Sequence, residues 1–197
     1  GHSNAVLGTS GLANNTTGAN NSSVGHGAMF DNTTGGNYTA LGYLALGDNT
    51  TASNNVAVGY EALRKNTTGT ENNAFGVGAL DSNTTGDENN AVGRGALGSN
   101  TTADGNNAFG DDALSLNVTG TGQTAFGHRA LQYSTATDNT AMGHLAGDAA
   151  TSAAERHRSS GGCLALAHCA LSAGLIVPTR VCACTPAPLC MPARSPC

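Results

Sequence analysis

Apolar and polar positions recur every 17 residues over residues 1–147 of this chain, and the repeated unit is clearest between Asn72 and Gly86. Every unit has a glycine at the same place, and the last of these anchor glycines comes one residue early. The anchors are Gly8, Gly25, Gly42, Gly59, Gly76, Gly93, Gly110, Gly127 and Gly143. A period of this length is too short for a pair of helices and suits one coil of a β-solenoid. The predicted fold is therefore all-β, a single-chain solenoid of about nine coils.

Apolar residues form columns at fixed distances from the anchors. The residue before the anchor gives Leu7, Val24, Leu41, Val58, Phe75, Val92, Phe109, Phe126 and Met142. The third and fourth residues after it are mostly alanine and leucine, as in Ala79 and Leu80. Stacked coils pack each residue on its equivalents, so we expect all these columns to build the core. Each unit is predicted to hold two extended segments, one ending at the anchor and one around the Ala-Leu pair.

Asparagine recurs at two further positions of the unit. Four residues before the anchor lie Asn4, Asn21, Asn55, Asn72, Asn89, Asn106 and Asn139, with Tyr38 and Gln123 as substitutes. We expect this amide column to form a structural hydrogen-bonded ladder along the rod. Seven residues after the anchor, each of seven units begins an Asn-x-Thr sequon. This sequon column consists of Asn15, Asn32, Asn49, Asn66, Asn83, Asn100 and Asn117.

The sequon column is predicted to lie in an exposed turn, because Asn, Thr and Gly are typical turn residues. In a secreted eukaryotic protein these asparagines would carry a row of N-linked glycans. Less regular sequons begin at Asn14, Asn20, Asn21 and Asn37. Two alternatives remain open: a plain turn without sugar, as in a bacterial or phage protein, and O-linked sugar on the paired threonines.

Composition changes sharply after the repeats. Residues 148–162 are predicted to form a linker. Residues 163–197 contain all six cysteines: Cys163, Cys169, Cys182, Cys184, Cys190 and Cys197. Crowded cysteines at irregular spacing predict disulfides in a secreted, extracellular protein, with the pairing left open. We expect a small stapled module that joins the array to the next subunit. The alternative is that this tail is a processed remnant or not authentic coding sequence.

Charge and chemistry narrow the possible functions. The formal net charge is −5, and only 11% of the residues are charged, which argues against nucleic acid or an anionic membrane as partner. No apolar run is long enough for a membrane span. The histidines share no motif with a nucleophile, and the acidic pairs Asp87-Glu88 and Asp111-Asp112 do not recur from coil to coil. We therefore predict no enzyme, no cofactor other than covalent glycans, and no metal.

The repeat Asn-x-Ala-Val/Phe-Gly-x-x-Ala-Leu-x-x-Asn-Thr-Thr-Gly resembles the head repeats of trimeric autotransporter adhesins and related phage and environmental fibre proteins, over residues 3–147. The resemblance implies a left-handed β-roll with an extracellular adhesive or fibrous role. This unit is longer by about the Asn-Thr-Thr segment, and neither a heptad stalk nor a membrane anchor follows. We therefore do not extend the trimeric state of the adhesins to this chain.

The leading hypothesis is a structural subunit of an extracellular glycosylated filament. The first coil starts close to Gly1, which leaves no room for a cap over its backbone edge. Either a neighbouring copy covers that edge or the chain was cut from something longer, so we expect copies to polymerise head to tail. The alternative is an adhesin or tail-fibre head that binds surface glycans, and an ice-binding solenoid is less favoured.

Overall fold

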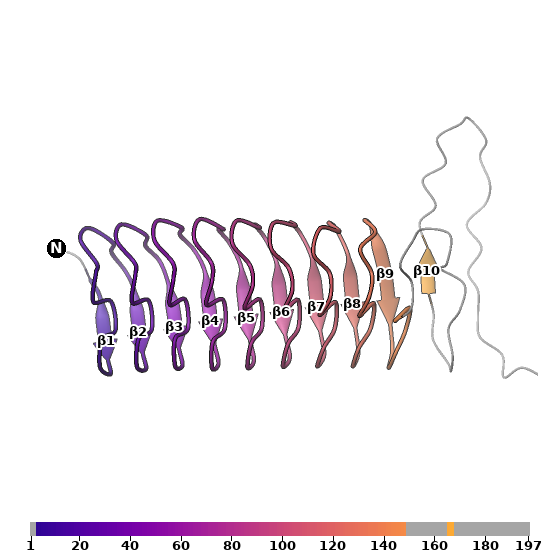
Figure 1. The fold of residues 1–197 in the computed structure, drawn as a ribbon, viewed down its shortest axis with the longest axis horizontal. Helices are drawn as coiled ribbons and strands as arrows, with labels where there is room; N and C mark the ends of the chain where they lie inside the picture. Colours follow the sequence, from indigo (N-terminus) through magenta and orange to yellow (C-terminus); the bar gives the residue numbers. More distant parts are fainter. Residues whose placement is uncertain (1–2, 149–164, 168–197) are drawn as a thin grey trace, which may run out of the picture.

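The computed structural model describes residues 3–148 and 165–167. In this part of the chain each repeat contributes one short strand to a single sheet, and Figure 1 shows the strands side by side in chain order with their turns stacked. The strands are β1 (Ala5–Leu7), β2 (Ser22–Val24), β3 (Thr39–Leu41), β4 (Val56–Val58), β5 (Asn73–Phe75), β6 (Asn90–Val92), β7 (Asn107–Phe109), β8 (Thr124–Phe126), β9 (Asn139–Met142) and β10 (Ala165–Ala167).

The strands from β1 to β9 pair in parallel, each with the next in the chain, so the fold is the predicted parallel β-solenoid. Phe75 of β5 lies opposite Val58 of β4 and Val92 of β6, which fixes the coil at 17 residues. The last step is one residue shorter and brings Met142 opposite Phe126. Strand β10 pairs antiparallel with β9. The left-handedness implied by the resemblance stays a prediction.

The core is thin and consists mainly of alanine and leucine. The middle residue of each strand from β2 to β8 points inward, as Ala74 does in β5, where it meets the alanines and leucines that follow the anchor, such as Ala79 and Leu80. In β1 the equivalent Val6 is exposed. Ala74, Ala79 and Leu80 are fully buried. Alanine keeps the two sides of the coil close together, so each leucine fills the width of the rod. The prediction that Ala74, Ala79 and Leu80 build the rod is confirmed.

The prediction that the column before the anchor belongs to the core is wrong. Phe75 is 42% exposed and Phe126 is 55% exposed, and the equivalent residues of the other coils also lie on the outer face. The physical reason is strand alternation: successive side chains of a strand point to opposite faces. Because Ala74 points inward, Phe75 must point outward.

The structure has a turn around the Ala-Leu pair, where the second extended segment of each unit was predicted. The described residues around Ala79 and Leu80 form no strand, and Leu80 has a φ of 53°. The left-handed region costs roughly 1–2 kcal/mol for a residue other than glycine. The eight residues at this position of the repeat, which are Met29 and seven leucines from Leu12 to Leu131, all adopt this left-handed conformation. We attribute this tolerance to burial of the side chain, because the turn is what directs Leu80 into the core.

Apart from β10, the predicted cysteine module lies outside the described residues, as does most of the predicted linker. This applies to all six cysteines and to their predicted disulfides. Within the described part of the chain, no helix is long and apolar enough to cross a membrane.

Candidate functional site

The sequon column lies inside the rod. The Asn66 side chain is fully buried, and its Nδ2 donates to the carbonyl oxygen of Gly69 at 2.9 Å and to Oδ1 of Asn49 in the preceding coil at 3.0 Å. Its own Oδ1 accepts from Nδ2 of Asn83 in the following coil at 2.9 Å. The same ladder links the column from Asn15 to Asn100. Most of these amides thus close their own turn and also bond coil to coil, whereas Nδ2 of Asn49 donates to the hydroxyl of Tyr38 in place of a turn carbonyl.

The prediction that the sequon column faces solvent is therefore wrong. Its members from Asn32 to Asn117 are fully buried, and Asn15 is half-buried. Polar side chains turn inward here because the thin core leaves the turn carbonyls without water, and the amides supply the missing donors. A glycan on Nδ2 of Asn66 would remove one of the two N–H groups that donate these bonds, and it would place a sugar inside the rod. The function proposed below therefore includes no row of glycans on this column.

Three of the irregular sequons do begin on the surface. Asn14, Asn20 and Asn37 are exposed, whereas Asn21 is buried. Nδ2 of Asn20 donates to Oδ1 of Asn37 at 3.2 Å, and Asn37 continues this outer ladder to Asn54 at 3.1 Å. Glycosylation of the exposed sequons stays a prediction.

The amide column is structural, as predicted. Oδ1 of Asn55 accepts from the backbone N–H of Asn72 in the next coil at 2.8 Å. Nδ2 of Asn72 donates to the carbonyl oxygen of Gly86 at 2.7 Å, which is the same oxygen that Nδ2 of Asn83 reaches at 3.0 Å. The two asparagine columns converge in this way on the carbonyl oxygens of Gly18, Gly35, Gly69, Gly86 and Ala103, and together they fill the polar half of the interior.

Tyr38 replaces asparagine in the amide column and is accommodated. Its buried hydroxyl accepts a hydrogen bond from Nδ2 of Asn49 at 2.8 Å. Burial raises the pKa of Tyr38 to about 12, against the lowering effect of its hydrogen bonds to Asn49 and Ser53. The hydroxyl therefore stays neutral at physiological pH and serves as a ladder member.

Gln123, the other substitute, breaks both ladders. Among the described residues, both side-chain amide atoms of Gln123 and Oδ1 of Asn100 and of Asn139 are buried without a hydrogen-bond partner. In the sequon ladder, Nδ2 of Asn117 does not reach Oδ1 of Asn100. The Asn117 amide bonds only within its own turn, where its Oδ1 accepts from the backbone N–H of Gly120 at 2.9 Å. The extra methylene of glutamine displaces the amide from the position that asparagine takes in the other coils.

Replacing Gln123 by asparagine is expected to stabilise the rod by about 1–2 kcal/mol, because unpartnered buried polar groups would regain hydrogen bonds. Urea unfolding followed by circular dichroism measures the change. Gln132→Asn is the matched control, since Gln132 already accepts from Nε of Arg129 at 2.8 Å and donates to Ser115 at 3.3 Å. A loss of stability in Gln123→Asn, or an equal gain in the control, would contradict this account of the defect.

The outer face of the sheet carries a line of exposed apolar side chains. The residues before the anchors, from Leu7 to Met142, form one line along the rod, which we call the apolar stripe. Taking 150–250 Å² for a large apolar side chain, the stripe exposes roughly 700 Å². A patch of this size on a soluble protein marks an interaction surface. Strand alternation was the sequence signal that could have identified it.

Stacked rings flank part of the stripe, in the column that follows the anchors. The rings of Tyr43 and Tyr60 stack with centroids 5.2 Å apart, and His26 stacks on Tyr43 at 5.5 Å. The rings of His128 and His144 also stack, with centroids 5.2 Å apart. No group of three histidine, cysteine, aspartate or glutamate side chains among the described residues is placed to hold a metal ion.

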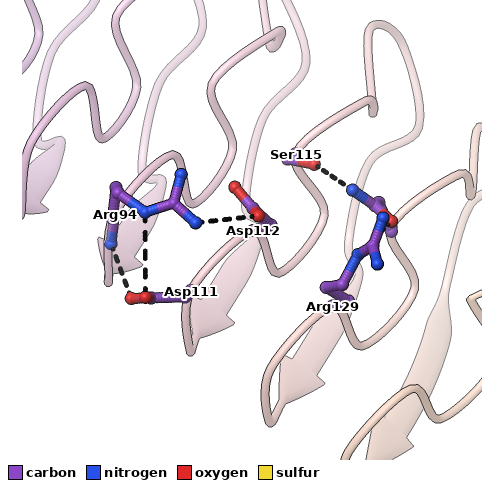
Figure 2. A network of polar contacts seen from close by, with 6 residues as sticks. Arg94, Asp111, Asp112, Ser115 and Arg129 are labelled. Carbon is purple, nitrogen blue, oxygen red and sulfur yellow. Dashed lines mark hydrogen bonds and ion pairs between the residues drawn. The ribbon is translucent and has the colours of Figure 1, made fainter.

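The acidic pair Asp111-Asp112 is engaged within the chain. Nη2 of Arg94 donates to Oδ2 of Asp112 at 3.2 Å, and the backbone N–H of Arg94 donates to Oδ1 of Asp111 at 3.0 Å (Figure 2). The other acidic pair is also partly occupied, since Asp87 Oδ1 accepts from the hydroxyl of Thr70 at 3.0 Å. Both pairs therefore bond neighbouring coils.

The paired threonines of the turn differ in exposure. The first is largely covered, as in Thr67, whose hydroxyl donates to the carbonyl oxygen of Thr84 at 3.0 Å. The second faces solvent in seven successive coils: Thr17, Thr34, Thr51, Thr68, Thr85, Thr102 and Thr119. This exposed column lies in the turn and outside the strands, so the ice-binding alternative gains no support.

No protein-family model, curated protein or solved structure matches the chain. The likeness to adhesin head repeats therefore stays a resemblance, and the chain is assigned to no family.

Proposed function

We propose that this chain is a structural subunit of an extracellular filament. The coils bond to one another through backbone pairing and two asparagine columns, so the described repeats form a stiff rod. With strands about 4.8 Å apart, the nine parallel strands span roughly 40 Å. The observation that carries the proposal is the apolar stripe, which continues over all nine of these strands and suits side-by-side contact along the length of another rod.

The extracellular location rests on the cysteine-rich tail, which is typical of oxidising compartments. Copies of the same chain are the proposed partner. The proposal differs from the sequence-based hypothesis in two respects: it needs no glycan sheath, and it adds side-by-side contact between rods. Joining end to end stays a prediction, as does the alternative of an adhesin that binds surface glycans.

Negative-stain electron microscopy of the full chain over a concentration series tests the filament. We expect particles many times longer than the roughly 40 Å of one rod, lengthening as concentration rises. Light scattering on the same samples measures the mass per particle and excludes sparse aggregates. Isolated short particles at the highest concentration would contradict the proposal, and saccharide binding on a glycan array by such particles would favour the adhesin.

A further inference from the structure

The side chains of the apolar stripe change in size along the rod, and this bears on what covers them. Before the central Phe75 the stripe holds only aliphatic residues, and after it lie two phenylalanines and a methionine. The order is Leu7, Val24, Leu41, Val58, Phe75, Val92, Phe109, Phe126 and Met142. We propose that a second copy of this chain covers the stripe face to face and antiparallel, with Phe75 of each copy at the centre.

The exposed area fits a pair of copies. A stable interface buries about 800 Å² on each partner. The stripe supplies roughly 700 Å² when large apolar side chains are taken at 150–250 Å² each. The flanking outer column of strand residues, such as Asn73 and Asn90, extends the same face. Two flat sheets that pack face to face lie about 10 Å apart, which suits one layer of interdigitating side chains from each copy.

Side-chain size favours the antiparallel arrangement. When one rod is reversed about Phe75, Val24 meets Phe126 and Leu41 meets Phe109, so a small residue faces a large one. In a parallel arrangement in register, two copies of Val24 would face each other and leave a gap. Two copies of Phe126 would crowd together at the other end of the stripe. In the reversed arrangement only the Val58–Val92 and Phe75–Phe75 contacts join residues of equal size. Well-packed interfaces have neither voids nor overlaps, so the more even separation of the sheets favours the reversed copy.

The column that follows the anchors supports the same orientation. The rotation that reverses the rod brings Tyr60 opposite Arg94, because they lie one coil to either side of Phe75. Both side chains are exposed, and an arginine over a tyrosine ring is attractive. The same rotation places Tyr43 opposite Asp111 and His26 opposite His128. No two carboxylates of this column face each other.

Light scattering after size exclusion tests the pair at concentrations below those that give long particles, so its result is independent of the filament. We expect a mass of two copies of 19.5 kDa. Phe75→Ser is expected to raise the dissociation constant by about 30-fold or more, because the two-fold axis uses this residue twice. Phe109→Ser should weaken the pair as well, and Leu116→Ser, exposed outside the stripe, should not. Circular dichroism confirms that each variant keeps its fold.

Orientation is tested by placing the photocrosslinker p-benzoylphenylalanine at position 109. We expect a crosslinked peptide that contains Leu41, which lies four coils away in the same chain and can be reached only in a reversed second copy. A crosslink between the two copies of position 109 would overturn the antiparallel arrangement. A mass of one copy or three copies for the wild type, or an equal effect of Leu116→Ser and Phe75→Ser, would overturn the pair itself.

Discussion

Replacing the anchor Gly76 by alanine is expected to lower the free energy of unfolding by at least about 3 kcal/mol, because backbone strain and a steric clash coincide. Gly76 has a φ of +137°, a conformation that other residues rarely adopt. A Cβ at this position would press on the carbonyl oxygen of Gly93 and lie 2.6 Å from its carbonyl carbon. Backbone atoms of the next coil cannot turn away as a side chain can, so the coils must separate.

Gly78→Ala is the matched control for this substitution. Gly78 also has a positive φ, of +65°, but an added Cβ meets nothing within 4 Å. Only the strain of the left-handed region remains, and we expect a loss of about 1–2 kcal/mol. Urea unfolding of both variants measures the difference. Equal losses would show that the close approach of the anchors does not hold the coils at their spacing.

Replacing Asn66 by alanine is expected to cost about 2–4 kcal/mol, since each buried polar group left without a partner costs about 1–3 kcal/mol. The substitution removes the only donor to Oδ1 of Asn49 and one of the two acceptors used by Nδ2 of Asn83. The carbonyl oxygen of Gly69 keeps the bond from Asn55 at 2.8 Å. The loss therefore comes from the ladder between coils and not from the turn.

Asn73→Ala separates burial from hydrogen bonding. Nδ2 of Asn73 donates to Oδ1 of Asn90 at 2.9 Å, a bond along the rod like that of Asn66, but it lies half-buried on the outer face. Water can replace this partner, so we expect a loss of no more than about 1 kcal/mol. Thermal unfolding of the two variants gives the comparison. A larger effect in Asn73→Ala than in Asn66→Ala would place the sequon column on the surface after all.

Much of the fold could be predicted from spacing alone. The anchor period placed a strand just before each glycine, and the recurrence of asparagine at the position of Asn72 identified a structural ladder. Both predictions depend on the translational symmetry of a coil, which any residue repeated at a fixed interval reports.

Orientation was harder to predict than position. The size and apolar character of Phe75 predict a core position. However, Asn72 just before strand β5 and Ala74 within it already point inward, and alternation leaves only the outer face for Phe75. Asn83 was assigned to solvent because its turn is polar. The signal missed was uniformity: asparagine recurs unchanged at seven sequon positions, whereas the preceding position varies, for example between Lys65, Ser82 and Leu116.

Hydrogen exchange of the asparagine side chains, measured by NMR on 15N-labelled protein, tests most directly whether the rod is held together by inward amides. We expect the Nδ2 protons of Asn49, Asn66 and Asn83 to exchange orders of magnitude more slowly than those of the exposed Asn37, because only opening of the coil stack exposes them. Signals are assigned through single substitutions. Exchange at Asn66 as fast as at Asn37, while backbone amides of the same coil stay protected, would contradict the account.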